Sequence, residues 1–181
     1  MADRYVALIR GINVGTAKRV AMADLRALVA GFGYTEVRTL LNSGNVVFAS
    51  RATPEAAADR LKKAMAAELG VTARVIVLTA AEVSRMVKEN SLSDVTDNPS
   101  RLMLSILASP ADRGLLTPLL KQKWGRETLA LGGRVAYIWC PDGILESKLS
   151  QAVSKALGEA VTTRNWATML KIHALLQGTD E

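Results

Sequence analysis

Two stretches, RYVALIRGINVG at residues 4–15 and LNSGNVVFAS at residues 41–50, set the architecture expected of this chain. The first joins an apolar run to a loop with two glycines, which is typical of a strand leaving a sheet. In the second, the tetrapeptide NSGN at 42–45 contains Gly44, which can take a positive φ in a tight turn. Together they predict a first strand and a later hairpin whose returning strand is 45–50.

Residues 1–78 predict the element order βαββαβ. Apolar residues at helical spacing predict two helices. The first ends at Gly31 and Gly33, and the second begins at Pro54 and ends before Gly70. The expected elements are strand 4–9, helix 22–32, strands 35–41 and 45–50, helix 54–69 and strand 71–78.

The same order returns after a helix at 80–89 and a polar linker at 90–100. Its elements are strand 101–108, helix 111–122, strands 127–131 and 135–140, helix 144–157, strand 160–163 and a last helix at 166–176. The expected fold class is therefore α+β, with two tandem ferredoxin-like (βαββαβ) units, antiparallel sheets and a C-terminal helix. The expected domains are 1–78, a connection at 79–100, a second unit at 101–165, and 166–181.

The faces of the strands indicate how such sheets are covered. A ferredoxin-like sheet has the strand order 4-1-3-2, and the first and third strands here are apolar on both faces. Apolar residues on both faces mean that both are covered, and the helices of this fold cover only one. We therefore expect the other half of the chain or a second chain on the second face, and a cleft between the halves as the ligand site. Aromatic residues are only 4% of the chain, which disfavours base stacking on the sheet.

Composition excludes several classes of protein. The longest stretch without charge is the 12 residues 39–50, too short to span a membrane. One cysteine, Cys140, permits no internal disulfide and suits a reducing compartment, so we expect a cytoplasmic protein. With one histidine, His173, a His/Cys zinc site is not expected, and no phosphate- or dinucleotide-binding motif implies a cofactor.

The net charge is +6, and residues 1–90 hold 13 Lys/Arg against 8 Asp/Glu. A basic half favours an anionic partner, whereas a modest positive charge also serves solubility alone. Both interpretations stay open.

Candidate ligand-binding residues fall in three segments. In the loop RGINVGTAKR, Arg10 and Lys18 supply positive charge and Asn13 supplies hydrogen bonds beside a helix N-terminus. The hairpin offers Ser43 and Asn45. The segment TTRNW offers Arg164 and Asn165, of which the asparagine is also a candidate N-cap. Each segment also has a purely structural interpretation, as a β–α turn, a hairpin turn and a helix cap.

Catalytic residues are poorly indicated. Cys140 and His173 lie in apolar surroundings, and Asp142 and Glu146 flank a helix start, where Asp142 is expected to act as a cap. Whether the chain is an enzyme is left open.

The stretches at 5–15, 41–48, 147–149 and 162–172 resemble the bacterial domain-of-unknown-function 1697 family. The resemblance covers nearly the whole chain and implies a cytoplasmic bacterial protein of two ferredoxin-like lobes, with no assigned reaction, substrate or cofactor. The motifs that carry it gather around Arg10, Gly11, Asn13, Ser43, Asn45, Arg164 and Asn165.

The favoured function is binding of a small anionic ligand, bearing phosphate or carboxylate, at the RGINVG loop and the cleft between the halves. Arg10, Lys18 and Arg164 would pair with its charge, while Asn13, Ser43 and Asn45 would orient it. The alternatives are a nucleic-acid-associated protein that uses the basic N-terminal half, or an enzyme of unknown reaction. No membrane partner is expected, and the oligomeric state is not indicated.

Overall fold

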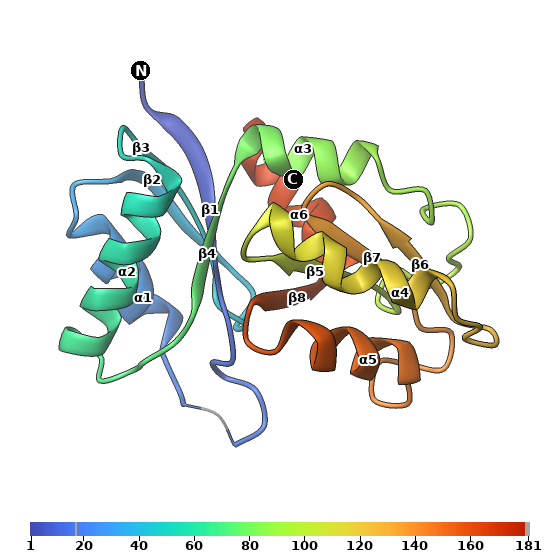
Figure 1. Cartoon of the computed structure of the whole chain (residues 1–181). Coiled ribbons are helices and arrows are strands. Elements are labelled where there is room, and N and C mark those ends of the chain that lie inside the picture. The colour runs from blue at the N-terminus through green and yellow to red at the C-terminus, as the bar shows by residue number, and fades with distance from the viewer. Residues whose placement is uncertain (17, 180–181) are drawn as a thin grey trace. The chain divides into compact units, whose positions relative to one another are not determined.

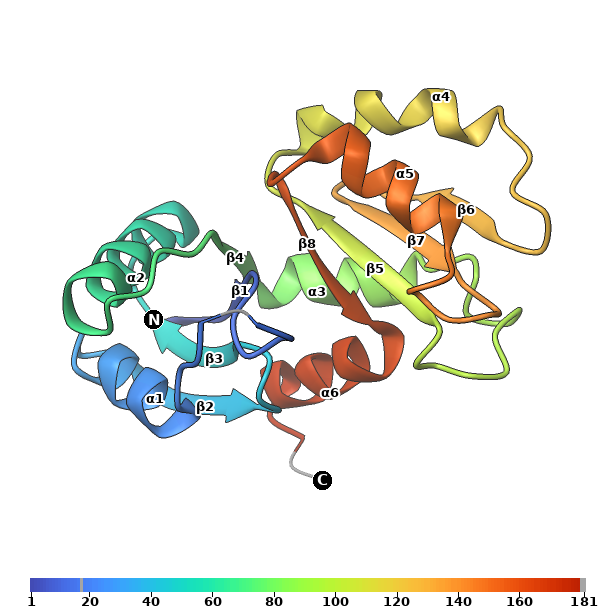
Figure 2. The same cartoon turned by 90° about the horizontal axis from the view of Figure 1, so that it is seen from below.

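The computed structural model describes residues 1–16 and 18–179. These residues form an α+β protein with two four-stranded antiparallel sheets and six α-helices (Figures 1 and 2). The chain divides into unit 1, Met1–Ser84 with Ile172–Glu181, and unit 2, Arg85–Lys171. The division falls inside the two helices α3 (Ala80–Lys88) and α6 (Trp166–Gln177). None of the described helices has the length and apolar character needed to cross a membrane.

Unit 1 is built on a sheet with the order β2-β3-β1-β4, in which β1 pairs with both β3 and β4. This is the predicted order, with the first and third strands in the centre. Its elements are β1 (Asp3–Ile9), α1 (Met22–Ala30), β2 (Thr35–Leu40), β3 (Asn45–Ser50), α2 (Pro54–Glu68) and β4 (Val75–Thr79). Residues of α1 and α2 share a buried core with one face of this sheet.

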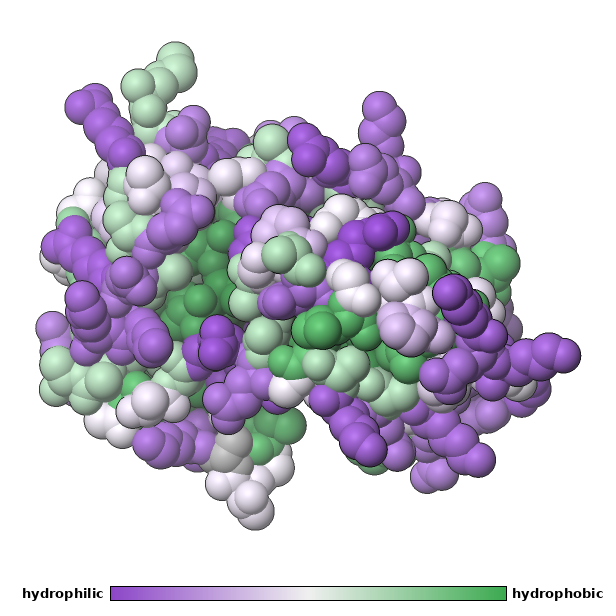
Figure 3. Space-filling model, in the orientation of Figure 1, coloured by the Kyte–Doolittle hydropathy of each residue, from purple (hydrophilic) through white to green (hydrophobic). Residues whose placement is uncertain are grey.

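Helix α2 shows how local sequence builds this layer. Thr53 caps it by accepting a hydrogen bond from the N–H of Ala56, and Pro54 occupies the first turn. Ala57, Leu61 and Met65 recur every four residues and are buried. The outer surface over α2 is largely hydrophilic (Figure 3), so the helix buries one stripe and exposes the other.

Strand β4 begins at Val75, four residues later than predicted. The reason lies in the exit from α2, where Gly70 has a φ of +65° and the N–H of Val71 bonds back to the carbonyl of Met65. This C-terminal cap uses residues that the apolar pattern assigned to the strand.

The second face of the unit 1 sheet is also buried, as its apolar residues predict. Val6, Leu8 and Leu78 are each 0% exposed. Within unit 1, two contacts join the end of α6 to the sheet and to α3. Arg4 donates to the carbonyl of Leu176, and Ser84 Oγ lies 3.1 Å from His173 Nε2.

Unit 2 repeats the strand order as β6-β7-β5-β8. Its elements are β5 (Leu102–Leu107), the 3-10 helix η1 (Pro110–Leu116), α4 (Thr117–Leu120), β6 (Thr128–Leu131), β7 (Val135–Trp139), α5 (Lys148–Leu157) and β8 (Val161–Asn165). One face of the sheet packs with η1, α4 and α5 around Leu116, Ile138 and Leu149.

Two predicted helices of unit 2 differ from the structure. The segment 111–122 is a 3-10 helix followed by the four-residue α4, because Pro118 has no N–H and its ring clashes with the carbonyl four residues earlier. Helix α5 begins at Lys148 rather than 144, with Ser147 as its N-cap. The prediction of Asp142 as a cap is therefore wrong, and Asp142 instead pairs with Arg126 at 3.0 Å.

Replacing Gly44 with alanine should destabilise the chain by about 1–3 kcal/mol. Gly44 has a φ of +84°, and a Cβ there would lie 3.0 Å from Ile12 Cδ1 and from Ile9 Cβ. Chemical denaturation of the whole chain measures the loss. Gly133→Ala is the control, because a Cβ at Gly133 meets nothing within 4 Å. Equal stability of the two variants would contradict the proposed strain.

The stability of unit 2 should depend on pH through Tyr137. Its hydroxyl donates to the carbonyl of Met86 at 2.6 Å, and burial raises its pKa above the ordinary value. Because the pKa of Tyr137 is higher in the folded chain, this tyrosine ionises at a lower pH in the unfolded chain. Its contribution to the free energy of unfolding is therefore complete below about pH 10 and falls by ~1.4 kcal/mol per pH unit above it.

The free energy of unfolding of Tyr137→Phe should be about 1 kcal/mol lower than that of the unchanged chain at pH 7, because the substitution leaves the Met86 carbonyl unpaired. This difference in the free energy of unfolding should shrink between pH 10 and pH 11, because only the chain with Tyr137 loses stability there. Denaturation across this range tests the expectation, and a deficit that stays constant to pH 11 would contradict it.

Candidate functional site

The loop between β1 and α1 has a backbone of alternating handedness. Gly11, Asn13 and Gly15 have φ values of +71°, +56° and +54°, whereas Ile12 and Val14 between them do not have positive φ. Alternation of right- and left-handed residues can turn successive N–H groups toward one side, an arrangement that binds anions in other proteins. The glycines make this shape accessible, since left-handed conformations cost them little.

The amide of Asn13 holds this loop in place. Its Nδ2 donates to the carbonyls of Val20 and Asn42 at 2.8 and 2.9 Å, and its Oδ1 accepts from the N–H of Val20 at 2.8 Å. The N–H of Asn13 also donates to the carbonyl of Lys18. The structure therefore gives Asn13 a role in closing the loop and fastening it to the β2–β3 hairpin; its predicted role in orienting a ligand stays a prediction.

The hairpin residues Ser43 and Asn45 also have structural partners. Asn45 is fully buried, and its Nδ2 donates to the carbonyl of Leu40 and to Ser43 Oγ, both at 3.0 Å. The N–H of Ile9 donates to the carbonyl of Gly44, which joins the end of β1 to the hairpin. The structure thus brings Asn13, Ser43 and Asn45 to one end of the unit 1 sheet.

Basic side chains surround the loop. Arg10 is half-buried, and its N–H donates to the carbonyl of Arg74 at 3.0 Å, which places the exposed Arg74 beside it. Lys18 and Arg19 are exposed, and Arg19 Nη2 donates to the carbonyl of Gly15. Sequence analysis missed Arg74. The antiparallel pairing of the first and fourth strands, which brings the end of one against the start of the other, could have pointed to it.

Arg164 and Asn165 belong to unit 2. Arg164 lies on β8, is 8% exposed, and donates through Nη1 to Thr162 Oγ1 and to the carbonyl of Thr163, both at 2.9 Å. Burial lowers the pKa of Arg164 to about 10. Asn165 Oδ1 accepts from the N–H of Thr168 at 2.8 Å, which confirms it as the N-cap of α6. Their predicted grouping with the RGINVG loop stays a prediction.

The weakly indicated catalytic residues are not assembled within either unit. Cys140 belongs to unit 2, and burial raises the pKa of its thiol, which disfavours the nucleophilic thiolate. His173 belongs to unit 1 and contacts Ser84. Within residues 1–16 and 18–179, no group of three His, Cys, Asp or Glu side chains could hold a metal ion.

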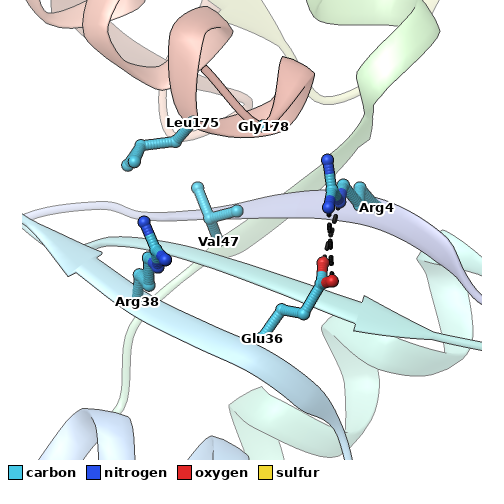
Figure 4. Close-up of a pocket in the computed structure, with 6 residues that line it drawn as sticks. All are labelled: Arg4, Glu36, Arg38, Val47, Leu175 and Gly178. Atoms are coloured by element: carbon cyan, nitrogen blue, oxygen red, sulfur yellow. Dashed lines mark hydrogen bonds and ion pairs between the residues drawn. The ribbon is translucent and has the colours of Figure 1, made fainter. Parts of the chain in front are cut away.

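Unit 1 also contains a pocket of about 180 Å³ that the sequence analysis missed (Figure 4). It is lined by Arg4, Glu36, Arg38, Val47, Leu175 and Gly178. No local motif marks these positions, because they come from three strands and from the end of α6.

Comparisons with known proteins bear on family and fold. A family model described as "Protein of unknown function (DUF1697)" matches residues 2–137. No curated protein matches the chain. A solved structure, "The structure of conserved bacterial protein SP0830 from Streptococcus pneumoniae", is similar at 22% identity with a TM-score of 0.75. The match covers 97% of this chain and 99% of that one, and at this identity it bears on the fold alone.

Replacing Asn13 with alanine should destabilise the chain by about 2 kcal/mol, because it removes the hydrogen bonds of the amide and strains a left-handed position. Amide hydrogen exchange should show faster exchange at Val20, whose N–H bonds to Asn13 Oδ1. Asn13→Gly is the matched control, since it removes the amide without the backbone strain. Unchanged exchange at Val20 in both variants would rule out the role assigned to the amide.

Proposed function

Because the chain belongs to the DUF1697 family, whose description assigns no activity, we propose a function from its own geometry: binding of a small anionic ligand at the β1–α1 loop. The ligand would carry a phosphate or carboxylate group, and the loop residues Gly11–Gly15 with Arg10, Lys18, Arg19 and Arg74 would hold it.

The observation that carries this proposal is the alternating backbone of Gly11, Asn13 and Gly15. In the part of the chain that the structure describes, the N–H groups of Gly11, Val14 and Gly15 make no hydrogen bond, and all three residues are exposed. Exposed N–H groups that make no hydrogen bond can donate to the oxygens of an anion without breaking existing bonds. Because Asn13 fixes the loop, little conformational entropy would be lost on binding.

The charge around the loop supports an anion rather than a neutral ligand. Residues 10–23 contain Arg10, Lys18 and Arg19 and no acidic residue. Helix α1 then begins after Ala21, which makes no side-chain cap hydrogen bond, and its first turn carries one acidic residue, Asp24, against the three basic residues. Hydrogen bonds from cationic donors to an anion are about twice as strong as those between neutral groups.

We also propose that each sheet with its helices is a ferredoxin-like unit and that the two units are a tandem repeat. The orders β2-β3-β1-β4 and β6-β7-β5-β8 support this, since each places the first and third strands in the centre. A cytoplasmic location is proposed as well, supported by a lone cysteine that has no disulfide partner.

Calorimetric titration at low salt tests the anion site with inorganic phosphate, pyrophosphate, acetate, nucleotides and a short oligonucleotide. The double variant Lys18→Gln/Arg19→Gln should bind the best small anion about 10–100-fold more weakly, as expected for the loss of charge-assisted hydrogen bonds. The matched control is Lys62→Gln/Lys63→Gln, which removes the same charge from the exposed face of α2. Its affinity should change by less than about threefold when both double variants are titrated at ~0.1 M salt, where charges more than about 10 Å apart are largely screened.

Equal losses in the two double variants would show that only overall charge matters and would refute a site in the loop. An absence of binding across the panel would refute anion binding altogether. Binding of the oligonucleotide alone, with affinity falling steeply as salt rises, would replace the proposal with the nucleic-acid alternative.

A further inference from the structure

Two exposed apolar side chains flank the hydrogen bond that joins the β1–α1 loop to the β2–β3 hairpin. Asn13 Nδ2 donates to the carbonyl of Asn42 at 2.9 Å. Val14 follows Asn13 in the loop, and Leu41 precedes Asn42 in the hairpin. Val14 is 61% exposed and Leu41 is 51% exposed. The junction of loop and hairpin therefore carries an apolar residue on each of its two segments.

The apolar residue between the two glycines that lie closest to this junction is turned inward instead. Ile12 is 1% exposed, and a Cβ on Gly44 would lie 3.0 Å from Ile12 Cδ1. The interior of the junction is thus filled by Ile12, and Val14 and Leu41 remain outside it. In Figure 3, the end of unit 1 that carries the β1–α1 loop shows hydrophobic surface beside hydrophilic groups.

Stability does not account for a leucine at position 41. Leu41 has a φ of +56°, a left-handed backbone that strains leucine, whereas glycine and asparagine adopt it more readily. The loop itself has asparagine at its own non-glycine position of this kind, Asn13. Burial would offset the strain only in part, because half of the Leu41 side chain is exposed to water. Strained residues of this type are concentrated at binding sites.

We propose that the anion bound at the β1–α1 loop is amphiphilic, with a phosphate or carboxylate head joined to a short aliphatic chain. This inference rests on the proposed function, in which the loop N–H groups, Lys18 and Arg19 hold the head. Val14 links the two parts of such a ligand, because its N–H makes no hydrogen bond in the described part of the chain and its side chain is exposed. A head that accepts from this N–H places its aliphatic chain beside Val14 and Leu41. Two side chains cover only a few carbon atoms, so the ligand is a small molecule free in solution.

Calorimetric titration of the whole chain with two pairs of soluble anions tests the proposal. The pairs are methyl phosphate with hexyl phosphate, and acetate with hexanoate. Each fully buried methylene strengthens binding by about fourfold, so burial equivalent to about two of them should make the longer anion at least about tenfold tighter. 1-Hexanol has the chain without the charge and should bind at least about tenfold more weakly than the hexyl anion. The methyl NMR signals of Val14 and Leu41 should shift with the longer anion and not with the shorter one.

Variants separate the apolar contact from the fold. Leu41→Asn should remove the preference for the longer anion, and its midpoint of thermal unfolding should not fall, because asparagine tolerates the left-handed backbone. Val14→Thr keeps the shape of the side chain, adds a hydroxyl and should reduce the preference. The matched control is Leu145→Asn, the same substitution at an exposed leucine of unit 2, which should leave the preference unchanged.

The outcomes distinguish this inference from the proposed function. Equal binding of the short and long anions, with both weakened in Lys18→Gln/Arg19→Gln, would keep the anion site and overturn the aliphatic contact. An unchanged preference in both Leu41→Asn and Val14→Thr would overturn that contact as well. Binding to phosphatidylcholine vesicles that contain phosphatidic acid, without binding of any soluble anion, would overturn the free ligand in favour of a membrane lipid. No binding to any of these probes would refute both the inference and the proposed function.

Discussion

Strand β1 hydrogen-bonds along both of its edges, to β3 and to β4, and this central position constrains every other feature of unit 1. Its middle residues are buried on both faces, so polar groups can reach the surface only at its ends. Arg4 near one end takes part in the pocket, and Arg10 beyond the other belongs to the β1–α1 loop. Five residues lie between them, and the six steps from Arg4 to Arg10 span about 20 Å of extended chain, so the loop and the pocket are separate.

Two sets of residues at the C-terminal end of β1 have different roles. Asn13 bonds to the hairpin and Gly44 allows Ile12 to approach it closely, while Asn45 fixes the hairpin itself. Lys18 and Arg19 stand at the surface beside it. The first set makes the backbone shape rigid and the second supplies the charge, and an anion site needs both, because binding is strongest when donors are already in position.

Unit 2 has the same strand order but different chemistry at the corresponding end of its first strand. After β5 the chain enters η1 through Ser109 and Pro110, with Ser109 capping the 3-10 helix. No glycine-rich basic loop occurs there, since residues 108–112 are ASPAD. A shared topology therefore carries different loops, and function is argued from the loops rather than from the sheet.

Most strands and helices, and the strand order of both sheets, followed from the sequence, because apolar spacing and turn residues such as Gly44 and Pro54 act locally. The errors arose where one residue outweighed the pattern, as Pro118 did in the segment 111–122 and Ser147 did at the start of α5. The neighbourhood of Arg10 and Arg74, and the pocket that joins Arg4, Glu36 and Arg38 to the end of α6, required the tertiary structure. Strand register and helix packing bring such residues together across long separations in sequence, and no local pattern of residues encodes those distances.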